Sequence, residues 1–316
     1  MPTLFLREDD VKSLLTMQDA VAAVEESFRL QGLGEAVARP RERLRTGKSH
    51  LNVMPASAPA LGVVGWKAYG GGAPMRDFLF STETGEFLAI VEGNWLGALR
   101  TGAATGVATK YQARADAATV GMIGTGRQAR TQLEAVCMVR SIKEVRAYSR
   151  TIEHRESFPA QMSDALGVRV RAVSEPQEAV KGCDIVVVIT NSRQPVLKGE
   201  WLEPGMHVNA AGGNSLLRQE LEPAAVARAA IITADSIEQA RKESADLFYA
   251  VENGLIGWEQ VVELGQVVCG RAPGRTSAAQ ITLFESQGLG LWDLAVANLA
   301  YRRARERGLG MELAML

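Results

Sequence analysis

The feature that most constrains the fold is a glycine-rich segment between an apolar run and an amphipathic stretch. Residues 119–129 read TVGMIGTGRQA, which places a GxGxxA motif where a β-strand ends and a helix begins. There Gly124 permits a tight turn, Gly126 lets the backbone approach a pyrophosphate, and Ala129 allows close helix packing. The helix N-terminus presents N–H groups and a positive dipole end to phosphates. The predicted dinucleotide contacts are Gly124, Thr125, Gly126, Arg127, Gln128 and Ala129.

Apolar runs alternate with helical patterns on the C-terminal side of this motif. This alternation predicts a parallel sheet with right-handed crossovers, that is, an α/β Rossmann domain over residues 117–288. A final helix is expected from about Leu291. The expected strands are 119–123, 144–148, 168–173, 184–190, 207–211, 230–233 and 281–284.

The first 116 residues have a different pattern. Thr16 and Asp19 form a capping box at the start of a helix that runs to about Gly32. Short β-prone runs and a long alanine-rich helix over 94–113 follow. These elements, together with the final helix, predict a smaller α+β domain of residues 1–116 with 289–316. The β-prone runs are 50–54, 62–69, 78–80 and 87–91, with a hairpin turn at 82–85.

Composition excludes several kinds of protein. The 316 residues are 47% hydrophobic and 22% charged with a net charge of −1, which is typical of a folded enzyme and favours neither nucleic acid nor an anionic membrane as partner. Three cysteines without CxxC spacing indicate a reduced, cytoplasmic protein, and the charged start is unlike a signal peptide. The histidines and cysteines show no metal-ligand spacing, so we expect no metal.

The end of the second Rossmann strand normally distinguishes the two nicotinamide cofactors, because an acid there binds the ribose hydroxyls and repels a phosphate. Here the chain has Ser149, Arg150 and Thr151 and no acid. Hydroxyls and a guanidinium suit a 2′-phosphate, so NADP(H) is preferred and NAD(H) is possible. In the alternative interpretation, Arg150 is only a solvated charge at a helix entry.

Seven segments together resemble the ornithine cyclodeaminase and mu-crystallin family over nearly the whole chain. That family includes cyclodeaminases, alanine dehydrogenases, imine and ketimine reductases, opine-type dehydrogenases and NADPH-binding crystallins, so the resemblance constrains the fold more than the substrate. The segments are residues 39–41 (RPR), 53–55 (VMP), 65–67 (GWK), 96–104 (LGALRTGAA), 121–129 (GMIGTGRQA), 208–212 (VNAAG) and 284–288 (FESQG).

The resemblance implies that Arg41, Lys67 and Arg100 hold an amino or imino acid opposite the nicotinamide. Such cations suit a small carboxylate, and burial of Lys67 after its apolar strand would lower its pKa enough for proton exchange. Arg43 competes with Arg41, because positions 41, 43 and 45 alternate along an extended chain and spacing alone cannot choose between them. Without the resemblance, a surface charge would be the commoner interpretation of Lys67.

One departure from the family pattern concerns chemistry. The resemblance implies an Asp as the base of cyclodeaminating members, and this chain has Asn214 near that position. An amide has no useful proton affinity, so NAD(P)H-dependent reduction of a C=N bond next to a carboxylate, or amino-acid oxidation in reverse, is favoured. The alternatives are a cyclodeaminase-type lyase with recycled NAD and a nonenzymatic NADPH-binding protein.

Other positions complete the sequence-based expectations. Strand ends supply further cofactor contacts, and Asp235 is interpreted as a helix N-cap. Asp293 is expected to be structural or close to the cofactor. Relatives pair the sheets of this smaller domain between subunits, so a homodimer is expected. The further cofactor contacts are Thr190, Asn191, Ser286 and Gly288.

Overall fold

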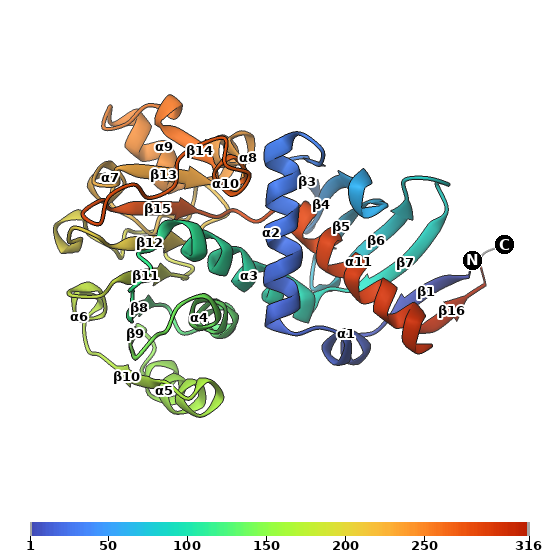
Figure 1. The fold of residues 1–316 in the computed structure, drawn as a ribbon, viewed down its shortest axis with the longest axis horizontal. Coiled ribbons are helices and arrows are strands. Elements are labelled where there is room, and N and C mark those ends of the chain that lie inside the picture. Colours follow the sequence, from blue (N-terminus) through green and yellow to red (C-terminus); the bar gives the residue numbers. More distant parts are fainter. Residues whose placement is uncertain (1, 315–316) are drawn as a thin grey trace. The chain divides into compact units, whose positions relative to one another are not determined.

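The computed structural model describes residues 2–314 and divides into two compact units. Unit 1 comprises residues 1–103 and 288–316, and unit 2 comprises residues 104–287. Helix α3 (Asn94–Gln112) continues across the boundary between them (Figure 1). The long helix expected over 94–113 is thereby confirmed, with an end one residue earlier.

Unit 1 contains an eight-stranded mixed sheet in the order β16-β1-β7-β6-β5-β4-β2, with β3 also paired to β4. Only β1 and β7 run parallel, and the other pairs are antiparallel. The sheet is larger than the sequence predicted, because β1 and β16 come from the two ends of the chain. Its strands are β1 (Thr3–Leu6), β2 (Val37–Ala38), β3 (Glu42–Thr46), β4 (Ser49–Ala58), β5 (Val63–Gly70), β6 (Ala73–Ser81), β7 (Phe87–Glu92) and β16 (Met311–Leu313).

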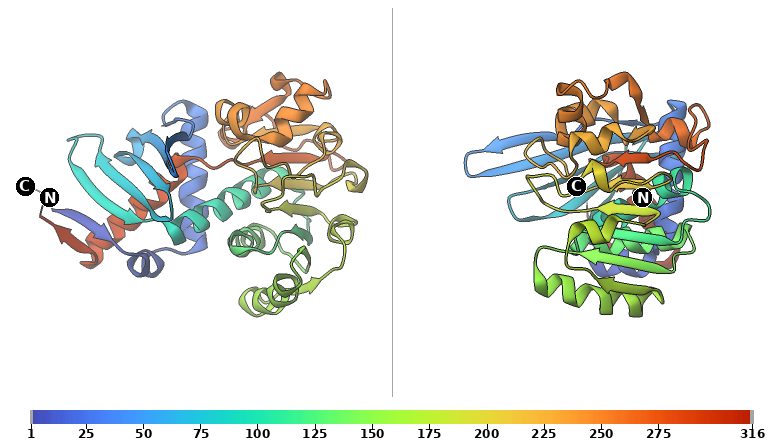
Figure 2. Two further views of the ribbon diagram at one scale, coloured as in Figure 1. Left: turned by 180° about the vertical axis from the view of Figure 1, so that it is seen from behind. Right: turned by 90° about the vertical axis from the view of Figure 1, so that its left-hand side faces the viewer.

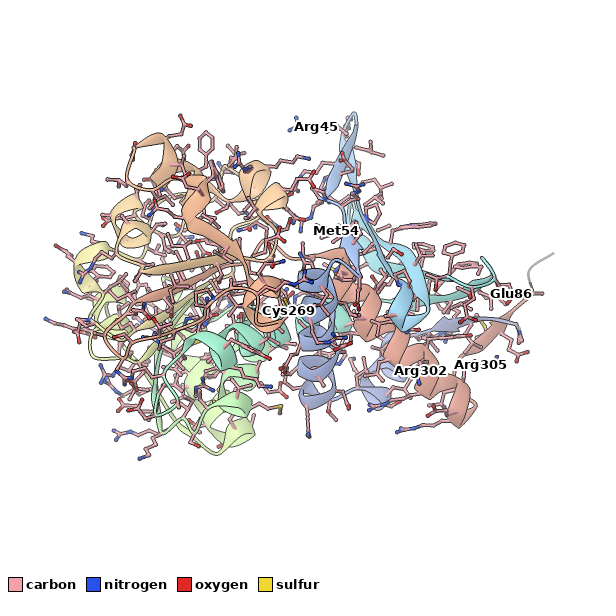
Figure 3. All side chains as sticks on the ribbon, turned by 45° about the horizontal axis from the view of Figure 1, so that its top comes forward. Arg45, Met54, Glu86, Cys269, Arg302 and Arg305 are labelled. Carbon is pink, nitrogen blue, oxygen red and sulfur yellow. The ribbon has the colours of Figure 1, made fainter. Side chains whose placement is uncertain are left out.

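Helices α2 (Met17–Leu33) and α11 (Gly290–Arg307) lie together beside this sheet (Figure 1), and α1 (Glu8–Leu14) precedes them. The Thr16 hydroxyl accepts a hydrogen bond from the Asp19 N–H and the Asp19 carboxylate accepts one from the Thr16 N–H, so the predicted capping box is confirmed. The rings of Phe28 and Trp292 pack with centroids 5.2 Å apart. Arg302 and Arg305 lie on the exposed side of α11 (Figure 3).

Unit 2 contains an eight-stranded, fully parallel sheet in the order β10-β9-β8-β11-β12-β15-β13-β14. The predicted parallel strands are confirmed, and β14 is an addition that its short length concealed. The strands are β8 (Thr119–Ile123), β9 (Glu144–Tyr148), β10 (Arg169–Ala172), β11 (Ile185–Val188), β12 (His207–Ala210), β13 (Ile231–Ala234), β14 (Val261–Glu263) and β15 (Thr282–Glu285).

Alternate residues of these strands enter two separate cores, one on each face of the sheet. Val187 packs on one face with Leu133 and Phe158, and its neighbour Val188 packs on the other with Val226. Helices therefore cover both faces, as in a doubly wound fold. Figure 2 shows the green helices α4 and α5 together on one side. The helices are α4 (Arg127–Val139), α5 (Ile152–Leu166), α6 (Pro176–Val180), α7 (Pro223–Ala227), α8 (Ile237–Glu243), α9 (Ala245–Glu252) and α10 (Leu264–Val268).

Within residues 2–314, no helix combines the length and apolarity needed to span a membrane.

Candidate active site

The turn between β8 and α4 has the geometry that the glycine motif predicts. Gly124 has φ +105°, and a Cβ there would lie 2.2 Å from the Ile189 carbonyl oxygen, so only glycine fits. A Cβ at Gly126, by contrast, would meet no atom within 4 Å. Gly126 is the N-cap residue of the 13-residue helix α4, so this open space lies at the N-terminus of the helix. An anion can approach the backbone there.

Two buried polar atoms in this turn accept or donate no hydrogen bond among the described residues. They are Thr125 Oγ1 and Gln128 Oε1. Buried polar atoms normally have partners, so their lack of one indicates that a ligand or water completes the site. The open side of Gly126 and these two atoms fit a dinucleotide pyrophosphate.

The carboxyl ends of adjacent parallel strands bring other predicted cofactor residues to the same edge of unit 2. β8, β11, β12 and β15 are neighbours, with Ile123, Val188, Ala210 and Glu285 aligned along their ladders. Ligands of open α/β sheets bind at this edge. The residues that follow these strands there include Thr190, Asn191, Asn214 and Ser286.

A buried carboxylate, Glu220, holds two of these loops in place. Its Oε1 accepts hydrogen bonds from the Thr190 N–H and hydroxyl, both at 2.6 Å, and its Oε2 accepts one from the Gly212 N–H at 2.7 Å. Thr190 follows β11 and Gly212 follows β12. Glu220 therefore links the two loops, and no local sequence pattern pointed to this role.

At the end of β9, Arg150 is exposed, Ser149 is half-buried and Thr151 is the N-cap residue of α5. No acid occurs between Tyr148 and Ile152. The hydroxyls and the guanidinium are thus placed at the N-terminus of a 15-residue helix, where negative charge is favoured.

A row of residues crosses the inner face of the unit 1 sheet. Met54 on β4 pairs with Lys67 on β5, Lys67 pairs with Asp77 on β6, and Asp77 pairs with Val91 on β7. Directly opposite residues of antiparallel strands project to the same face. All four are buried. Arg41 directly precedes β3, whose first residue, Glu42, pairs with Val53 on β4.

Two cationic side chains of unit 1 converge on one carboxylate oxygen. Lys67 Nζ lies 2.7 Å and Arg100 Nε 3.0 Å from Asp293 Oδ1. Lys67 and Asp293 are at most 1% exposed, and Arg100 is 7% exposed. Burial lowers the pKa of Lys67, and the negative charge of Asp293 opposes that shift. The structure thus joins two predicted substrate residues, Lys67 and Arg100, through Asp293.

Arg100 retains unused hydrogen-bonding capacity. Its Nη1 is buried and has no hydrogen-bond partner among the described residues, and the same holds for Asp293 Oδ2. A Cβ at Gly288 would lie 2.8 Å from Arg100 Nη1, and Gly288 has φ +84°. Because residue 288 is a glycine, no side chain covers Nη1 of the Arg100 guanidinium from this position.

Burial separates Arg41 from Arg43, which spacing could not do. Arg41 is 7% exposed, whereas Arg43 is exposed and its Nη1 lies 3.4 Å from Asn52 Oδ1. Figure 3 shows Arg45 at the far end of the β3–β4 hairpin. Arg41 is thus buried, and Arg43 and Arg45 belong to the exposed hairpin.

The interpretation of Asp235 as an N-cap is wrong. Ser236 caps α8, since its hydroxyl accepts a hydrogen bond from the Gln239 N–H. Asp235 instead accepts bonds from the N–H groups of Ser236 and Gln287. A one-residue shift of the helix start explains the error, because Asp and Ser are both good caps.

Other reactive groups are poor candidates for chemistry. Burial raises the pKa of the Cys137 thiol to about 12 and that of Cys183 to about 11, so neither is a ready thiolate. Among residues 2–314, no group of three His, Cys, Asp or Glu side chains is placed to hold a metal.

Sequence reasoning missed Asp77 and left the role of Asp293 open. Asp77 and Leu79 are alternate residues of β6, and both point to its buried face. The sequence shows this alternation, but the neighbouring Arg76 is also charged, so the pattern alone does not say which of the two charged residues is buried. Asp293 lies 226 residues from Lys67, and no local signal connects them.

Comparison with known proteins identifies the family. A model described as the ornithine cyclodeaminase/mu-crystallin family matches residues 1–308. The chain belongs to this family. An alanine dehydrogenase from Archaeoglobus fulgidus is 38% identical over 322 residues, covering 99% of this chain and 98% of that protein. The predicted membership and the α/β Rossmann fold are confirmed.

Solved structures of the family agree closely with this one. A Thermococcus litoralis Δ1-pyrroline-2-carboxylate reductase in complex with NADH and L-proline is 34% identical, with a TM-score of 0.93 over 98% of this chain and 100% of that one. The iminosuccinate reductase of Paracoccus denitrificans in complex with NAD⁺ is 33% identical, with a TM-score of 0.94 over 100% of each chain. An archaeal alanine dehydrogenase dimer with bound NAD is 38% identical, with a TM-score of 0.93 and full coverage of both chains.

Proposed function

We propose that this protein is an NAD(P)H-dependent oxidoreductase that reduces the C=N bond of a small imino acid or cyclic imine carboxylate, and oxidises an amino acid in reverse. The observation that carries the proposal is the buried contact of Lys67 and Arg100 with Asp293, in a family member with an intact dinucleotide turn. The family relatives that act on CH–NH groups, two reductases and an alanine dehydrogenase, support the same reaction class.

The two units contribute separate parts of the reaction. The turn at 124–129 of unit 2 would hold the pyrophosphate, and the nicotinamide supplies the hydride when the cofactor is bound. Arg100 Nη1 and Arg41 would hold the substrate carboxylate, since a guanidinium offers paired donors to it. Lys67 would donate a proton to the imino nitrogen, because burial lowers its pKa and makes the ammonium a better acid.

Asn214 argues against a cyclodeaminase-type lyase. Its amide cannot serve as the base that activates water, although it can orient a substrate. An assay with ornithine and NAD tests this directly, and ammonia and proline as products would favour the lyase over the reductase. A crystallin-like binding protein without activity is disfavoured by Arg41, Lys67 and Arg100, which such a role does not require.

For the cofactor, we propose NADPH as the preferred form. The support is the corner of Ser149, Arg150 and Thr151, which has no acid to repel a 2′-phosphate. A charged hydrogen bond from Arg150 would contribute about 1.5–3 kcal/mol. Titration should show tighter binding of NADPH than NADH, and Arg150→Asp should reverse the order. Unchanged NADPH binding in that variant would count against this corner.

The outer face of the unit 1 sheet supports a homodimer. Trp66, Phe78, Phe80 and Phe87 stack there with centroids 4.7–6.4 Å apart, on the face opposite to Lys67. A groove of about 520 Å³ runs beside Trp66 and Phe80. A second copy is the proposed occupant, since the archaeal alanine dehydrogenase is a dimer. Sedimentation should show a dimer at micromolar concentration, and Phe80→Glu should yield monomers. A parent protein that sediments as a monomer would exclude the proposed dimer.

The experiment that tests the main function is a screen of 2-oxo acids with amines, and of cyclic imine carboxylates, with NADPH oxidation followed. Lys67→Ala should lower turnover by roughly a hundred- to ten-thousand-fold, the usual cost of losing a general acid. Cofactor affinity should stay nearly unchanged, since its turn lies in unit 2. Lys242→Ala removes an exposed lysine, paired with Glu238, and is the matched control. Near-normal turnover of Lys67→Ala on every active imine would overturn the assignment.

A further inference from the structure

Asp77 is a buried acid in the row of residues that contains Lys67. In the antiparallel β5–β6 pair Lys67 and Asp77 stand directly opposite each other, so their side chains project to the same face. Asp77 is 0% exposed. Neither of its carboxyl oxygens has a hydrogen-bond partner among the described residues. Lys67 donates to Asp293 instead, which leaves two of its three ammonium protons for other acceptors.

The surroundings of Asp77 favour its protonated form. A buried carboxylate without hydrogen bonds is costly, and burial is the largest cause that raises the pKa of Asp77 to about 8. The negative charges of Asp293 on α11 and Glu8 on α1 raise it further, while Lys67 and Arg100 lower it. Asp77 therefore retains a proton near neutral pH and can release it within the working range of most enzymes.

Two glycines allow the backbone to approach Asp77 and Lys67 closely. A Cβ at Gly93 would lie 2.8 Å from Asp77 Oδ2, and a Cβ at Gly97 would lie 3.0 Å from Lys67 Nζ. The end of β7 and the first turn of α3 therefore approach both groups closely without supplying a side chain. The acid and the amine remain each other's neighbours on the sheet.

We propose that Asp77 is the proton reserve of Lys67. In the proposed reduction, on which this inference rests, the imino carbon gains the hydride of a dihydronicotinamide and the nitrogen gains a proton from the Lys67 ammonium. The Asp77 carboxyl then transfers its proton to the Lys67 amine, and the resulting carboxylate regains a proton from water between turnovers. In the oxidative direction the proton passes from the substrate nitrogen to Lys67, then to Asp77 and then to water. Asp77 is thus a positioning residue that acts through Lys67.

The test compares Asp77→Asn with the parent enzyme in imine reduction from pH 6 to 10. The parent kcat should decline above about pH 8, as the reserve proton is lost. Asp77→Asn should have a kcat at least tenfold lower at pH 7 and lack that decline, with unchanged NADPH affinity. Asp77→Glu, which restores a carboxyl group, should recover a pH-dependent limb. Glu238→Gln is the control, since it removes an exposed acid of unit 2 that is paired only with Lys242 in the structure.

Infrared titration of the resting enzyme supplies a readout that needs no turnover. The spectrum of the parent minus that of Asp77→Asn should contain a protonated-carboxyl band that titrates near pH 8, whereas the spectrum of the parent minus that of Glu238→Gln should contain none. Identical bands in the parent and Asp77→Asn, or an unaltered pH profile of kcat, would overturn the inference. An enzyme inactive on all imines but with the expected band would overturn the proposed function and leave the proton on Asp77 established.

Discussion

Both units bury carboxyl groups, but the groups that offset the cost of this burial differ between the units. In unit 1, Asp293 lies against the cations Lys67 and Arg100, and Asp77 stands opposite Lys67. In unit 2, Glu220 accepts hydrogen bonds from Thr190 and Gly212, and, within residues 2–314, it forms no ion pair with Lys or Arg.

Two further acids of unit 2 follow the second pattern. Asp246 Oδ1 accepts hydrogen bonds from the N–H groups of Glu220 and Leu221 at 2.8 and 2.9 Å. Glu285 accepts from the Ser244 hydroxyl and the Gln287 amide. Backbone N–H groups hold a carboxyl group in place but do not exchange protons with it. A lysine beside a carboxyl group can exchange a proton. The buried acids of unit 1 therefore suit proton chemistry, whereas those of unit 2 suit a fixed shape of the loops at the carboxyl edge of the sheet.

The largest effect on stability is expected from Asp293→Asn. The change leaves Lys67 and Arg100 as buried cations without a counter-charge, and breaking a buried pair in this way costs about 3–5 kcal/mol. Urea denaturation of the variant should show this loss in the free energy of unfolding. Glu238→Gln is the control, because its exposed pair with Lys242 should contribute less than about 1 kcal/mol. A loss below about 1 kcal/mol for Asp293→Asn would mean that the unit 1 cluster does not depend on charge pairing.

A smaller effect is expected from Glu220→Gln in unit 2. The amide keeps one acceptor oxygen, so at least one of the N–H groups of Thr190 and Gly212 loses its partner, at a cost of about 1–3 kcal/mol. Dinucleotide affinity should fall in this variant, since both loops lie at the carboxyl edge of the sheet. Calorimetric titration with NADPH measures it. Equal losses of NADPH affinity in Glu220→Gln and Asp293→Asn would contradict the proposed difference between the buried acids of the two units.

Taken per pH unit, the smallest effect is the pH dependence that Asp246 gives to stability. Burial first, and the charge of Glu220 second, raise its pKa from 3.8 to about 8 in the folded state. The folded state then binds more protons than the unfolded state between about pH 4 and pH 8, so stability falls as the pH rises through that window. The slope is about 1.4 kcal/mol per pH unit for one proton. Asp246→Asn should reduce the slope by about one proton in urea titrations from pH 5 to pH 8, and an unchanged slope would contradict the shift.

Local patterns were sufficient for much of the fold. The GxGxxA turn, the alternating strands of unit 2 and the capping box at Thr16 each depend on residues that are close in the chain. The strands β1 and β16 were missed because their pairing is between opposite ends of the chain, so neither run shows a partner nearby. The same limit applies to Glu220, which is buried only because the loops after β11 and β12 meet around it.

Local sequence alone was enough to predict the dinucleotide turn, because Gly124 takes a backbone conformation, φ +105°, that residues with a side chain rarely adopt. It also predicted Lys67 and Arg100 as substrate residues by type and segment. Only the tertiary structure distinguished the buried Arg41 from the exposed Arg43 and placed Asp77 and Asp293 beside Lys67. The physical reason is that burial and charge pairing depend on strand register and on contacts across long separations, such as the 226 residues between Lys67 and Asp293, and such contacts form only when the chain folds.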